Sequence, residues 1–142
     1  MIAIDTNVLV RYIVGDDARQ SALATRFIED ELTPERPGLV TTIALIELSW
    51  VLRRRYGASA QAVAGVVRAL LAARQLAVEN AEVVEQALAL PHEDLADTLV
   101  HEFGRAAGCE KTVTFDRTFA RLPGVERLGG MRPLGRASSI LG

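Results

Sequence analysis

Short segments that favour strands alternate with helical segments along the chain, and this alternation limits the fold more than any other feature. Strands are predicted at residues 1–4, 39–42, 76–79, 112–115 and 125–128. Helices are predicted at residues 8–14, 18–32, 43–56, 59–74, 81–90, about 95–107 and 117–122. Strands separated by helices pair in parallel, because the connecting helix carries the chain back to the starting end. The sequence therefore predicts an α/β fold: an α/β/α sandwich with a mainly parallel central sheet.

The chain length and the absence of repeats or interior linkers predict one domain. The 142 residues match one compact unit. We expect this domain to cover residues 1–130. We expect residues 131–142, which are rich in Gly, Pro, Arg and Ser, to form a loose tail.

The composition places few limits on the partner. Sixteen basic and 18 acidic residues give a net charge of −2, which neither requires nor excludes a nucleic acid. The single cysteine excludes an intrachain disulfide and favours a reducing compartment. The N-terminus lacks a basic segment and its apolar run stops after four residues, so we expect no signal peptide. No run of 18 apolar residues predicts a membrane span, and a cytoplasmic protein is expected.

Two acids directly follow predicted strands. Asp5 follows the first strand and Asp116 follows the strand at 112–115. Ligands of open α/β sheets bind beyond the carboxyl ends of the strands, which makes both acids candidates for a functional site. Each acid also precedes a helix, and a simple capping role explains either position equally well.

Glu47 has apolar helical neighbours on its own face, among them Ile43 and Trp50. That setting predicts a carboxylate at the core or at the lip of a cleft. A buried charge needs a cation, hydrogen bonds or a metal ion. A structural arginine partner is the alternative explanation.

Asp94 and Asp97 lie three residues apart at the start of a predicted helix, so both can share one face of its first turn. Asp94 also suits a cap, whereas the position of Asp97 favours a cleft. The only histidines, His92 and His101, show no metal-binding spacing. We expect both to be structural residues on the surface.

These acids together point to a divalent metal ion. Carboxylates that converge without a basic partner repel one another unless cations neutralise them. Mg²⁺ and Mn²⁺ prefer oxygen ligands, and such sites commonly hydrolyse phosphodiesters. No Gly-rich phosphate loop and no GxSxG motif offers a different chemistry.

The order and spacing of these motifs resemble the PIN domain family, and most closely the VapC-type toxins of toxin–antitoxin pairs. The resemblance covers Met1 to about Leu128. It depends on the segments Ile4–Leu9, Glu47–Leu52, Asp94–Leu99, Gly108–Cys109 and Thr114–Arg117.

The resemblance implies an Mg²⁺- or Mn²⁺-dependent endoribonuclease that forms homodimers and is inhibited by an antitoxin peptide lying along its cleft. It makes Asp5 and Asp97 the main metal ligands, with Glu47 and Asp116 as secondary ligands, and all four catalytic. Supporting positions are Thr6, Asp94 and Thr114, while Thr98 stands where the family commonly has a small alanine.

Arginines near these acids are candidates for binding RNA phosphates. The alternatives are a favourable interaction with the helix dipole for the Arg run and a surface ion pair for Arg117. The candidates are Arg11, Arg53, Arg54, Arg55 and Arg117.

Two other functions remain open. A phosphatase of the haloacid-dehalogenase type also begins with an Asp after its first strand. It requires a second Asp where this chain has Asn7, and a catalytic lysine, for which only Lys111 is present. A catalytically silent PIN-like module that binds protein is the second alternative.

Overall fold

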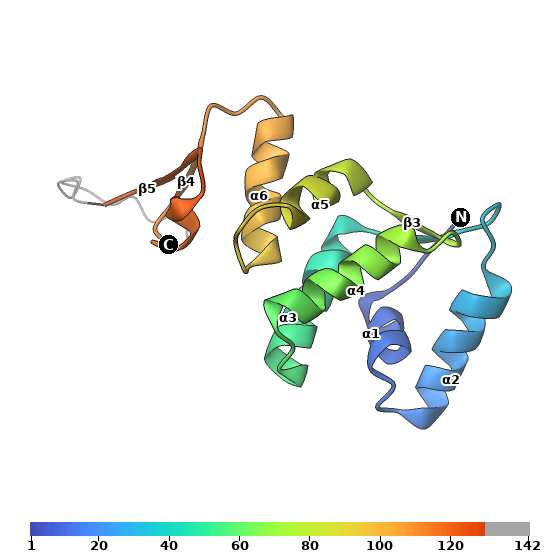
Figure 1. Cartoon of the computed structure of the whole chain (residues 1–142). Helices are drawn as coiled ribbons and strands as arrows, with labels where there is room; N and C mark the ends of the chain where they lie inside the picture. The colour runs from blue at the N-terminus through green and yellow to red at the C-terminus, as the bar shows by residue number, and fades with distance from the viewer. Residues whose placement is uncertain (130–142) are drawn as a thin grey trace, which may run out of the picture.

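A computed structural model describes residues 1–129 of the chain (Figure 1). The predicted tail, residues 131–142, lies outside the described residues. None of the described helices is long and apolar enough to cross a membrane. The elements in order are β1 (Ile2–Ala3), α1 (Thr6–Val14), α2 (Ala18–Arg26), the π-helical turn η1 (Phe27–Glu31), β2 (Gly38–Val40), α3 (Thr42–Tyr56), α4 (Ala60–Ala72), β3 (Leu76–Val78), α5 (Ala81–Leu88), α6 (Leu95–Ala106), β4 (Thr112–Thr114), the 3₁₀ turn η2 (Phe119–Arg121) and β5 (Val125–Arg127).

The strands pair in parallel, and the α/β prediction is confirmed. Within residues 1–129 they form two separate sheets, of order β1-β2-β3 and β4-β5. Figure 1 shows these sheets at opposite ends of the molecule, with α5 and α6 between them. Within residues 1–129, β2 therefore pairs on both sides, whereas β1, β3, β4 and β5 each pair on one side only.

The main core lies between the three-stranded sheet and the helices that follow its strands. Leu45, Leu48 and Leu52 of α3 are almost completely buried in it. Gly38 of β2 lies so close to the ends of the Ile4 and Leu32 side chains that a Cβ atom there would overlap both. The middle strand is therefore packed tightly against this core.

A second, smaller core holds the β4–β5 unit together. Phe119, Leu122 and Val125 are buried against one another, and Leu90, two residues after the end of α5, packs on them. This core is separate from the main one, which explains why the two sheets need not be continuous.

Two predicted helices differ from the structure. The helix expected at 18–32 widens into the π-helical turn η1 after Arg26. The helix expected at 117–122 is only the 3₁₀ turn Phe119–Arg121, and Leu122 is already extended (ψ 137°), as favoured for a residue before a proline, here Pro123.

Candidate active site

Asp5 and Glu47 meet through Thr6, the first residue of α1. Asp5 has extended backbone dihedrals and caps α1, where its Oδ1 accepts a hydrogen bond from the Thr6 amide at 2.8 Å. The Thr6 hydroxyl donates to Oε1 of Glu47 at 3.1 Å. Thr6 itself is almost buried, at 9% exposure, so this link between the two acids is held in place by the core.

A pocket of about 250 Å³ opens between these two acids, and the side chains of Arg11 and Arg55 also line it. Glu47 is exposed at the lip of this pocket. Its apolar neighbours do not bury it, because Ile43 and Trp50 are themselves 72% and 44% exposed. The pocket combines anionic ligands for a cation with cationic groups for an anion.

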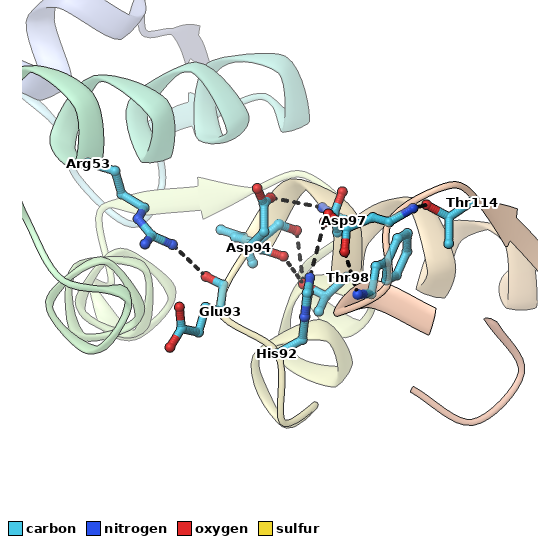
Figure 2. A network of polar contacts seen from close by, with 10 residues as sticks. Arg53, His92, Glu93, Asp94, Asp97, Thr98 and Thr114 are labelled. Atoms are coloured by element: carbon cyan, nitrogen blue, oxygen red, sulfur yellow. Dashed lines mark hydrogen bonds and ion pairs between the residues drawn. The ribbon is translucent and has the colours of Figure 1, made fainter. Parts of the chain in front are cut away.

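Asp94 and Asp97 lie at the start of α6, as expected (Figure 2). The Asp94 Oδ1 accepts a hydrogen bond from the Asp97 amide at 3.1 Å, which is the predicted cap. Oδ2 of Asp97 lies 3.1 Å from Nε2 of His92. This histidine was not predicted as a partner of the acid. The only signal for it in the sequence is its position five residues earlier.

The prediction that both histidines lie on the surface is wrong. The His92 side chain is 6% exposed and stacks on the Phe119 ring, with centroids 5.3 Å apart. His101 is 4% exposed, and its Nδ1 lies 2.8 Å from the hydroxyl of Thr112. Both rings fill the contact between α6 and the β4–β5 unit, where a flat side chain with one polar partner packs well.

Asp116 follows β4 and is exposed. Its Oδ1 accepts a hydrogen bond from the Phe119 amide at 2.8 Å, and its own amide donates to the Thr114 hydroxyl at 3.0 Å. The Thr114 hydroxyl therefore shapes the turn that carries this acid.

The four acids do not converge inside one chain. Asp5 and Glu47 share a pocket, Asp97 lies at the start of α6, and Asp116 belongs to the β4–β5 unit. Among residues 1–129 no three Asp, Glu, His or Cys side chains lie close enough to hold a metal ion together. The Asp5 and Glu47 pair still fits Mg²⁺, which is often held by one or two carboxylates, water and substrate phosphate.

The candidate arginines differ in their contacts. Arg11 donates to Asp16 and Gln20, and the hydrogen bond with Asp16 raises the pKa of Arg11. Arg53 donates to the Glu93 carbonyl at 3.0 Å (Figure 2).

Two further arginines of the run also differ. Arg54 lies over the Trp50 ring at 5.6 Å, whereas Arg55 lines the pocket of the two acids. Arg117 is exposed, beside Asp116. Arg55 and Arg117 are therefore better placed for a phosphate than Arg53 and Arg54, whereas Arg11 lines the pocket with its guanidinium paired to Asp16.

These features define a parallel α/β protein with acidic side chains beyond the carboxyl ends of its strands. The model of the PIN domain family matches residues 2–125, and the chain belongs to this family. The match covers β1 to β4 and reaches the first residue of β5. PIN domains are generally nucleases that bind nucleic acids and typically use divalent metal ions. A comparison with curated proteins finds no match to the chain.

Proposed function

We propose that this PIN domain is an endoribonuclease that depends on Mg²⁺ or Mn²⁺. The observation that supports it most is the pocket in which Asp5 and Glu47 meet at Thr6, with Arg11 and Arg55 in its wall. The two carboxylates supply oxygen ligands, while the two guanidinium groups favour a phosphate at the same place.

The residues of this pocket have distinct roles in the proposed reaction. The α1 cap fixes the Asp5 carboxylate, and the Thr6 hydroxyl orients Glu47. Arg55 attracts the phosphate that enters beside them. A bound divalent ion supplies Lewis acidity at the scissile phosphate. Asp97 and Asp116, which lie outside this pocket, are the other two acids of the proposed catalytic set.

The test is cleavage of RNA by the purified chain with Mg²⁺, with Mn²⁺ and with excess EDTA. We expect chelation to abolish cleavage and either ion to restore it. Asp5→Asn should remove activity without loss of stability, because Asn caps a helix as well as Asp does. Asp30→Asn, at an exposed position of η1, is the matched control. Full cleavage in EDTA contradicts the proposal. Phosphate-ester hydrolysis without RNA cleavage favours the phosphatase, and inactivity with both ions favours the silent module.

The proposal includes a toxin of a toxin–antitoxin pair that acts in the cytoplasm as a homodimer. Ile43 and Trp50 support a protein partner, because they form exposed apolar surface on α3 beside Glu47. An antitoxin segment lying there would cover Glu47. Induced expression in bacteria should arrest growth, and Asp5→Asn should relieve the arrest. Normal growth with the wild-type chain counts against the toxin.

A further inference from the structure

The face of α3 that carries Glu47 also carries an exposed aromatic side chain. Trp50 follows Glu47 by three residues, and Arg54 follows Trp50 by four. Residues at these spacings are neighbours on one helix face, with about 5–6 Å between their Cβ atoms. Trp50 is 44% exposed, and Glu47 and Arg54 are exposed on either side of it. An indole ring therefore lies one helical turn from a proposed catalytic acid.

Arg54 gives the Trp50 ring a defined orientation and a positive charge. The guanidinium carbon lies 5.6 Å from the ring centroid, within the range of a cation–π interaction. A single exposed apolar side chain is common on protein surfaces, so exposure alone does not define a site. An aromatic face next to a cation, however, is the combination with which proteins bind single-stranded nucleic acids. The pair therefore has the chemistry of a site for a nucleobase.

The helix below the ring is held firmly in place. Leu48 and Leu52, on the opposite face of α3, are almost completely buried in the main core. Arg53 donates a hydrogen bond to the Glu93 carbonyl at 3.0 Å, which ties α3 to the segment before α6. A binding group on a packed helix keeps its position more precisely than one on a loop. The distance between the ring and the proposed site is therefore fixed.

The charges around the ring favour a nucleic acid over an apolar peptide segment. Arg54 and Arg55 are both exposed, and Arg55 lines the pocket of Asp5 and Glu47. Phosphates on the two sides of a bound base would meet these cations. Ile43, which is 72% exposed, lies on the other side of Glu47, away from the arginines. A carboxylate therefore interrupts the apolar surface between Ile43 and the ring.

We propose that Trp50 is a stacking platform for one unpaired base of the RNA substrate, next to the phosphate at Asp5 and Glu47. The platform rests on the proposed nuclease function, because it makes single-stranded RNA the substrate of that function. Bases within a duplex are stacked on their neighbours, so only an unpaired base can offer its face to the ring. Every base has such a face, and the platform therefore selects single strands and not a sequence. An antitoxin segment on the same surface would exclude the base.

Fluorescence of the wild-type chain tests the stacking directly, because Trp50 is its only tryptophan. The probe is a short single-stranded RNA of mixed sequence, added in EDTA so that the proposed cleavage does not proceed. An abasic strand of the same length has the same charge without bases, and a duplex of the same sequence has no free base faces. We expect the single strand alone to quench the Trp50 emission. Equal quenching by the abasic strand, or none by the RNA, overturns the proposal.

Substitutions separate base stacking from the binding of a protein. Trp50→Ala should weaken RNA binding by about 5- to 150-fold, the loss expected for one stacked base, and should leave the affinity for the abasic strand unchanged. Trp50→Phe keeps an aromatic face and should recover part of the loss. Ile43→Ala removes an exposed apolar side chain without an aromatic face and is the matched control, with unchanged RNA affinity. Equal losses in the two alanine variants, or none in Trp50→Ala, leave this surface to a protein partner and overturn the proposal.

Cleavage kinetics separate the platform from the proposed function. Trp50→Ala should raise KM by the factor by which it weakens RNA binding and should leave kcat close to that of the wild type, because the lost contact is present in both the bound substrate and the transition state. Cleavage with an unchanged KM overturns the platform while the nuclease stands. If the wild type cleaves no RNA but single strands still quench Trp50, the proposed function fails and the platform stands. The quenching requires no substitution, so it decides the matter even if Trp50→Ala does not fold.

Discussion

Replacing Thr6 by valine removes the hydrogen bond to Glu47 and leaves a side chain of almost the same shape. The lost bond spans 3.1 Å and ends on a charged group, and such bonds contribute about 1.5–3 kcal/mol. We expect about 1.5 kcal/mol, because the exposed Glu47 regains water. The new methyl group lies at a position that is 9% exposed and offsets about 0.8 kcal/mol by its burial. The free energy of unfolding should therefore fall by only about 0.7 kcal/mol.

The effect on the proposed cleavage should be larger than the effect on stability. Glu47 loses the group that orients it, and about 1.4 kcal/mol of lost positioning corresponds to a tenfold slower reaction. Thr6→Ser keeps the hydroxyl and is the control, with cleavage close to that of the wild type.

A double-mutant cycle of Thr6→Val and Glu47→Gln, measured by denaturant unfolding, gives the coupling between the two side chains. We expect about 1 kcal/mol. A coupling below about 0.3 kcal/mol, within the error of additivity, refutes the proposed link between the two residues.

Three other perturbations test the packing around the site. His92→Ala should lower the free energy of unfolding by about 1–3 kcal/mol, since it removes a ring stack on Phe119 and a hydrogen bond, whereas His92→Phe should retain the stack. Gly38→Ala should cost about 1–3 kcal/mol by overpacking the middle strand, and an unchanged melting temperature would contradict this. The hydrogen bond from the Thr42 amide lowers the pKa of Glu79 below its ordinary 4.5. The stability from that bond is present above pH 4.5 and is lost as the pH falls through the lowered pKa, so melting temperatures of Glu79→Gln should depend less on pH there.

Much of the fold could be predicted from the sequence because it depends on local chemistry. The five strands and most helices follow from apolar periodicity and from caps such as Asp5, Asp94 and Gly57, which act on their own first or last turn. Two helices were predicted wrongly: the one expected at 18–32 widens into the π-helical turn η1, and the one expected at 117–122 is only the 3₁₀ turn η2. The family follows from the same local motifs in their order.

The burial of individual side chains was decided by tertiary contacts. Glu47 has apolar helical neighbours, yet it is exposed because Ile43 and Trp50 have no covering element within residues 1–129. The two histidines carry no burial signal in the sequence, and they are buried because the β4–β5 unit packs on α6. Periodicity shows which face a residue shares, but it does not show what covers that face.

The sequence by itself determined which acids follow a strand and which acids lie at the start of a helix. A residue's place in its own helix or strand depends on its neighbours along the chain. Which acids meet was decided by the tertiary structure alone. Asp5 and Glu47 come together through Thr6, whereas Asp116 remains with the β4–β5 unit. The pairing of strand edges depends on contacts between segments far apart in the chain, and a local pattern specifies each strand without specifying its neighbour.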